Sequence, residues 1–285
     1  ASGDEKTLHN SDVLMQNLNA GFAWISGNLQ AGFAISTMHN EFGLPGHEHH
    51  DDHDPDHTGH EEEEEEGAAR VDMDQTRLDV NANWAMNSGP WQSLNWKMGL
   101  VDYKHSEGHV EEHDENEVVE AVDGHDDHGG LSTFKRKAVE SRLSVNYQAD
   151  QKNKGVLGLQ LNNSDFSADG GEAIVPNTHS TGLALFALHS FAIRDDLNTE
   201  LAARLERNRH DVDTSQLTST HEEECEIDIS EVKDRQFNHY SLSGGLQFKA
   251  SDQVSVRSNI SRVSRAPAAQ ELYSCGPHES TQTFE

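Results

Sequence analysis

Histidine and acidic residues are concentrated in two stretches of the chain, residues 43–70 and 105–135. Imidazole nitrogen suits divalent metals such as zinc, copper and nickel, and carboxylates add oxygen ligands and negative charge. Within the first stretch these ligands follow one another at spacings of one to four residues, which imposes no single geometry. We therefore expect both stretches to capture a divalent metal ion through interchangeable ligands. The candidate ligands are His47, His49, His50, His53, His57, His60, His105, His109, His113, His125 and His128.

A solvated acidic surface loop is the ordinary interpretation of a charge run, and Glu61 to Glu66 would fit it. The histidines do not fit it, because surface charge alone does not require imidazole. The acidic run lowers the local electrostatic potential, which raises the rate at which cations arrive. In the second stretch His105, His109 and His113 are four residues apart, and on a helix they would share one face and could chelate an ion.

The overall composition excludes several classes of function. A net charge of −30, from 51 acidic and 21 basic residues, would repel the phosphates of a nucleic acid. No nucleophile elbow, phosphate-binding loop or HExxH pair occurs, so we do not expect an enzyme. Cys225 and Cys275 fall in long polar segments, where a disulfide is one expectation and a thiolate–zinc site the alternative. The scattered histidines are expected to be surface or lumen residues; they are His9, His39, His179, His189, His210, His221 and His239.

The dominant pattern outside the two stretches has a period of two. For example, Leu78, Val80, Ala82 and Trp84 alternate with polar residues, which gives a strand one apolar and one polar face. About ten strands are predicted in this way, and most are longer than the five or six residues usual in globular proteins. No apolar run approaches the roughly 20 residues of a membrane helix. The predicted strands are 13–26, 28–42, 71–87, 91–104, 136–149, 155–166, 180–194, 196–209, 236–250 and 253–265.

Short turns and long polar connections alternate along the whole chain. The long ones are 43–70, 105–135, 167–179, 210–235 and the residues after 266. This asymmetry is typical of a transmembrane β-barrel, with tight periplasmic turns and long extracellular loops. Charged residues in mid-strand on the polar face indicate a wide, wet lumen. The fold prediction is therefore all-β, an antiparallel transmembrane β-barrel, and a soluble all-β sandwich is the alternative.

Three stretches resemble a known family of outer-membrane proteins. Residues 41–50 read EFGLPGHEHH, residues 171–178 read GEAIVPNT before LALFAL at 183–188, and residues 265–278 read RAPAAQELYSCGPH before TFE at 283–285. Together they resemble the TonB-dependent outer-membrane receptors, and most closely their zinc-receptor branch. The Arg-Ala-Pro…Glu-Leu-Tyr core is the part most widespread in that family.

The resemblance implies several things about this chain. Such receptors have a barrel of about 22 strands closed by an N-terminal plug, so residues 1–285 are expected to be an internal barrel fragment without its plug. The resemblance also implies location in the outer-membrane lipid, extracellular His-rich loops, and Zn²⁺ as transported cargo. Energy would come from the TonB–ExbB–ExbD complex through the plug. His278, in the Gly-Pro-His motif, and Glu172 become candidate zinc ligands.

Two alternatives to a zinc receptor remain open from the sequence. One is a soluble periplasmic all-β protein that buffers metal. The other keeps the receptor class but changes the cargo to haem, copper, nickel or a metal chelate, since copper binds more tightly than zinc to such ligands.

Metal retention by the first stretch should weaken below about pH 6, because imidazole binds a metal only when neutral. A peptide covering residues 43–70 should therefore bind Zn²⁺ more weakly at about pH 5.5 than at about pH 7.5, as measured by titration. Equal affinity at the two pH values would show that the histidines are not the ligands.

Overall fold

The computed structural model describes residues 10–44, 68–110, 131–170, 175–215, 232–274, 277–278 and 283–284. Within these ranges one antiparallel sheet contains ten strands in chain order, as the alternating pattern predicted. Its strands are β1 (Val13–Ser26), β2 (Leu29–Gly43), β3 (Ala68–Ser88), β4 (Trp91–Val110), β5 (Ser132–Gln148), β6 (Asn153–Asp169), β7 (Asn177–Arg194), β8 (Leu197–Asp213), β9 (Arg235–Lys249) and β10 (Ser255–Arg262). Two short strands, β11 (Pro277–His278) and β12 (Thr283–Phe284), pair separately.

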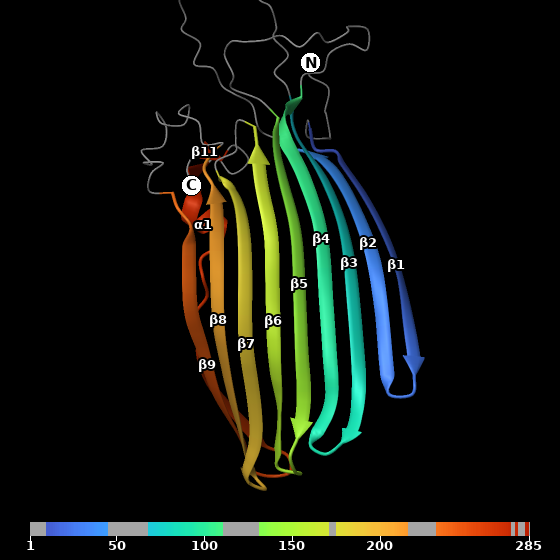
Figure 1. Cartoon of the computed structure of the whole chain (residues 1–285), viewed down its shortest axis with the longest axis vertical. Coiled ribbons are helices and arrows are strands. Elements are labelled where there is room, and N and C mark those ends of the chain that lie inside the picture. Colours follow the sequence, from blue (N-terminus) through green and yellow to red (C-terminus); the bar gives the residue numbers. More distant parts are fainter. Residues whose placement is uncertain are drawn as a thin grey trace, which may run out of the picture.

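The sheet is tall and curved, and its tight turns lie at the lower end in Figure 1. β3 is the longest strand at 21 residues, which corresponds to about 70 Å at roughly 3.4 Å per residue. A lipid hydrocarbon layer is only about 30 Å thick. The strands are therefore long enough to cross such a layer and to extend well beyond it at the upper end.

One face of the sheet is apolar over its lower and middle parts. Val80 of β3 lies opposite Phe33 of β2 and Met98 of β4, and the same row continues in alternation along neighbouring strands. Leu205 is 61% exposed and Leu185 is 57% exposed. A continuous exposed apolar surface of this kind indicates contact with lipid or with another apolar surface, because its exposure to water is unfavourable.

The other face carries the charged residues that the sequence assigned to a wet lumen. Arg77 donates to Asp79 at 2.7 Å, and Arg204 donates to Glu206 at 2.6 Å and to Gln160 at 3.1 Å. These side chains are partnered across strands or along one strand, so the polar face is a hydrogen-bonded network. The prediction of one apolar and one charged face is confirmed.

The lower turns are held by local polar contacts. Gly27 adopts a positive φ of 54°, which permits the tight reversal between β1 and β2. In the β5–β6 turn, hydrogen bonds from the Asn153 side chain and the Lys152 backbone lower the pKa of Asp150. Lys152 also reaches Asp195 in the β7–β8 turn at 2.8 Å. Neighbouring turns are thereby tied together at the lower edge.

Several strands extend further upward than the sequence pattern indicated. β4 continues past the expected end at residue 104 to Val110, and β5 begins at Ser132, before the expected start at 136. His105 and His109 therefore lie in a strand and not in the loop or helix considered for residues 105–135. The pattern ended early because both faces are polar there, so alternation of hydropathy no longer marks a strand.

A short helix, α1 (Ala269–Tyr273), follows β10 and lies beside the upper parts of β8 and β9 (Figure 1). The Tyr273 hydroxyl donates to the Lys233 carbonyl at 3.1 Å, and His210 Nε2 donates to the Pro267 carbonyl at 3.2 Å. His210 is on the charged face, so this segment covers part of that face. No helix in the described ranges is long and apolar enough to cross a membrane.

The first turn of α1 is fixed by one ion pair. Arg265 donates to Glu271 at 2.7 Å, and the Ala268 backbone N–H donates to the same carboxylate at 2.7 Å. The Arg265 hydrogen bond, followed by that of Ala268, lowers the pKa of Glu271 to about 2. Glu271 therefore remains ionised in the folded protein at any physiological pH.

A charge placed on the apolar face should destabilise the barrel, and the same charge on the other face should not. Leu143→Lys on β5 should lower the free energy of unfolding by about 2–4 kcal/mol, the range for lysine at mid-membrane. Ser144→Lys, one residue further and on the charged face, is the matched control. Denaturant unfolding of the protein in lipid would measure both; equal losses would contradict the assignment of faces.

Candidate metal-binding site

Most of the ligands expected from the sequence lie outside the described residues. The structure therefore leaves their arrangement as a prediction. They are His47, His49, His50, His53, His57, His60, His113, His125, His128 and Glu172, together with Cys225 and Cys275. For His109 in β4 and His278 in β11 only the strand position is described.

His105 is the one expected ligand whose side chain is described, and it lies on the charged face of β4. Its ring stacks on Phe134, with centroids 4.6 Å apart and planes at 15°. The Tyr103 ring, two residues away on the same strand, has its centroid 5.5 Å from that of His105 and is tilted by 56°. The imidazole therefore packs against two aromatic rings, and among the described residues it is not part of a group of three metal-ligating side chains.

A group not expected from the sequence does bring metal-ligating atoms together. His39 of β2 and Asp72 and Asp74 of β3 have one ligand atom each within 4.8 Å of the others. Within the described ranges no other three such side chains meet this condition. We call these three residues the His39 cluster.

The register of one hairpin builds the His39 cluster. His39 lies directly opposite Asp74, and Asp72 is two residues away on the same face of β3. His39 Nδ1 is 3.0 Å from Asp74 Oδ1 and 3.5 Å from Asp72 Oδ1. Ligand atoms around a tetrahedral zinc ion with bonds of about 2.1 Å are roughly 3.4 Å apart. The two distances from His39 Nδ1, 3.0 and 3.5 Å, lie on either side of this value.

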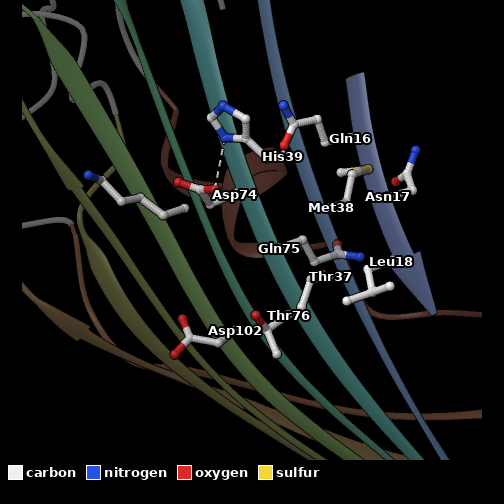
Figure 2. Close-up of a pocket in the computed structure, with 11 residues that line it drawn as sticks. Gln16, Asn17, Leu18, Thr37, Met38, His39, Asp74, Gln75, Thr76 and Asp102 are labelled. Atoms are coloured by element: carbon white, nitrogen blue, oxygen red, sulfur yellow. Dashed lines mark hydrogen bonds and ion pairs between the residues drawn. The ribbon is translucent and has the colours of Figure 1, made fainter. Parts of the chain in front are cut away.

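The cluster is open to solvent. His39 is 34% exposed, and the side chains of Asp72 and Asp74 are 58% and 61% exposed. Figure 2 shows His39 and Asp74 pointing toward each other above Thr37 and Thr76, which lie further down the same strands. One nitrogen and two oxygen ligands would leave the remaining positions of an ion to water or to another ligand. This incomplete set suits an exchangeable ion better than a structural one.

The cluster occupies a boundary on the apolar face. Ile35 and Leu78, which lie opposite each other, are the last apolar pair of the β2–β3 hairpin before Thr37, Thr76 and the cluster. Above the cluster, β2 ends at Gly43 and β3 begins at Ala68. The strands that carry the cluster are therefore the strands that hold the first His/acid stretch.

A second histidine–aspartate contact on the same face lacks the third ligand. His179 of β7 lies opposite Asp165 of β6, with Nδ1 and Oδ1 2.6 Å apart. Its Nε2 is 3.4 Å from the Asn163 amide nitrogen. Asp211, across the strand on the other side, is engaged by Arg209 at 2.5 Å. His179 therefore provides a natural comparison for His39.

Comparisons with known proteins agree with this fold. A family model described as TonB dependent receptor-like, beta-barrel matches residues 9–284. Three solved structures are similar at low identity: "Copper transporter OprC" (12% identity, TM-score 0.69), the alcaligin outer-membrane receptor FauA from Bordetella pertussis (12%, 0.51) and the ferric yersiniabactin uptake receptor FyuA from Yersinia pestis (10%, 0.55). No curated protein matches the sequence.

These similarities cover most of this chain and a minority of each known one. The matches include 91%, 84% and 87% of this chain, and 39%, 34% and 37% of the three structures in the same order. The chain thus corresponds to less than half the length of the structures it resembles. At this level of identity the likeness concerns the fold alone.

Replacing His39 should remove one bound ion from the protein. The His39→Ala protein should bind one Zn²⁺ fewer than the unmodified protein at neutral pH, because the remaining carboxylates offer no nitrogen ligand. His179→Ala is the matched control and should bind the full number. Isothermal titration of both variants would measure this, and an unchanged count for His39→Ala would reject the cluster as a site.

Proposed function

Because the chain belongs to the TonB-dependent receptor-like β-barrel family, we propose that it is part of an outer-membrane receptor that captures and imports zinc. The observation that carries the metal assignment is the His39 cluster, with its imidazole nitrogen 3.0 and 3.5 Å from two carboxylates. It lies where the strands leave the apolar region and enter the first His/acid stretch.

In this proposal the His/acid stretches 43–70 and 105–135 face the exterior and concentrate metal ions. Their acidic residues attract cations over a distance, and their histidines bind transiently. The His39 cluster is an ordered position at the base of the first stretch, where an ion can be held between encounters. His278 and Glu172, which the family resemblance suggests as ligands, would provide the selective step further along.

The rest of the receptor would supply the parts needed for import. A plug would close the lumen, and the TonB–ExbB–ExbD complex would move it using energy from the inner membrane. The charged face of the sheet, with Arg77–Asp79 and Arg204–Glu206 pairs, offers the polar wall that such a lumen requires. The outer-membrane lipid would contact the apolar face.

Zinc is the favoured cargo because the described ligands are one imidazole and two carboxylates. Such a set lacks the soft sulfur ligands that favour Cu(I). Copper(II) and nickel remain the alternative cargoes, and one protein of similar fold is named as a copper transporter. Haem or a metal chelate would need an enclosed pocket, whereas the described cluster is open to solvent.

The alternative of a soluble metal-buffering protein is disfavoured by the surface. Leu201 is 51% exposed and Leu242 is 50% exposed, and they belong to the continuous apolar face. In a soluble sandwich, a second sheet would have to cover this face. The family assignment supplies lipid as the covering instead.

Uptake should depend on the histidines of the first stretch when zinc is scarce. In cells that rely on the intact receptor, changing His47, His49, His50, His53, His57 and His60 to Ala should lower ⁶⁵Zn uptake about tenfold at limiting zinc, because local ion concentration falls. Uptake at saturating zinc should be nearly unchanged.

A control variant separates ligation from charge. Changing Glu61 to Glu66 to glutamine keeps every histidine, so it should slow uptake only at low ionic strength, where charge attracts ions over a distance. Parallel arms with copper, nickel and haem identify the cargo. Unchanged zinc uptake in the histidine variant would reject the zinc assignment. Uptake of copper, nickel or haem in preference to zinc would also reject it.

A further inference from the structure

Two lysines face each other on the sheet without an acidic partner. Lys104 of β4 and Lys135 of β5 are direct cross-strand partners. Like charges placed opposite each other destabilise a sheet. In a chain with 51 acidic and only 21 basic residues, an isolated pair of lysines is unexpected. Within the described ranges neither amine has a carboxylate at ion-pair distance.

The acids around this pair are engaged elsewhere. Asp74, which lies opposite Lys104 on its other side, is 3.0 Å from His39. A third lysine, Lys137, lies two residues beyond Lys135 on the same face and is 3.6 Å from Asp102. Asp165, opposite Lys137 on β6, contacts His179 at 2.6 Å. Lys137 therefore has an ion-pair partner, whereas Lys104 and Lys135 have none among the described residues, because the nearby carboxylates contact His39, His179 and Lys137.

The opposed pair of Lys104 and Lys135 lies immediately above the apolar face. On β5 the side chains on this face pass from Lys135 and Lys137 to Val139 and Leu143, and Lys104 is followed on β4 by Asp102 and Leu100. Two residues along a strand correspond to about 7 Å, which a lysine side chain can span. The ammonium groups are thus at the depth where a lipid covering Leu100 and Val139 would place its headgroup.

We propose that Lys104 and Lys135 bind a phosphate group of a membrane lipid whose acyl chains lie on the apolar face of β4 and β5. Directly opposed side chains are about 5 Å apart at Cβ, so two ammonium groups can reach one phosphate. The phosphate converts the repulsion between Lys104 and Lys135 into two attractions. The inference depends on the membrane placement of the fold and is independent of the cargo.

Removing the opposed charges should weaken lipid binding. In the intact receptor, the double variant Lys104→Gln/Lys135→Gln should bind bisphosphorylated lipid A in detergent micelles about thirtyfold more weakly, since each basic residue near an anionic surface contributes roughly fivefold. Dephosphorylated lipid A should bind both proteins equally weakly. Native mass spectrometry of the protein–lipid complex would give the affinities.

Two controls keep the outcome interpretable. Arg136→Gln removes the positive charge next to Lys135 in sequence but on the opposite face of β5, and it should retain binding. The variant Lys104→Arg/Lys135→Arg keeps the charges and should also retain binding, which tests the site even if the glutamine variant does not fold. Loss of binding in the arginine variant would overturn the proposal.

Two further results would also overturn it. One is unchanged lipid A affinity in a folded glutamine variant. The other is displacement of lipid A by inorganic phosphate at equal concentration, which would indicate a free-phosphate site in place of a lipid site. A zinc-uptake defect in the lysine variants is not expected, so failure of this inference is distinguishable from failure of the proposed cargo.

Discussion

Backbone pairing is the constraint on which the rest of this structure depends. In lipid, each N–H and C=O must find its partner within the protein, so the strands pair along nearly their whole length. Shifts of register occur only beside the lower turns, between Ala85 and Ser88, Trp91 and Ser93, and Ala192 and Arg194. Above these points an unbroken ladder fixes the partner of every side chain across the described sheet.

That ladder decides the chemistry as well as the fold. Because side chains alternate between faces, pairing brings residues far apart in sequence onto the same row. Near the upper edge of the apolar face it places His39 against Asp74, Lys104 against Lys135, and His179 against Asp165. The same ladder places the Arg204 network on the other face. The proposed metal ligands and the proposed phosphate-binding lysines are thus brought together by the register of the strands.

The sequence could predict the strands and their faces because hydropathy alternates wherever lipid lies on one side and water on the other. It could not predict the upper strand ends, such as β4 through His105 to Val110, since both faces are polar there and pairing alone maintains the strand. It pointed to metal chemistry in the His/acid stretches but passed over His39. His39 and Asp74 are 35 residues apart. Their contact could have been predicted only from the residue-by-residue register of the hairpin formed by β2 and β3.

Asp74 connects the two sites on the upper edge of the apolar face. It lies between His39 on one side and Lys104 on the other. Its carboxylate contacts the imidazole at 3.0 Å and leaves the lysine without that partner. A carboxylate turned toward Lys104 would neutralise the lysine and leave His39 with one acid, which would weaken both sites together. The direction of this single side chain therefore separates the proposed metal site on β2–β3 from the proposed phosphate site on β4–β5.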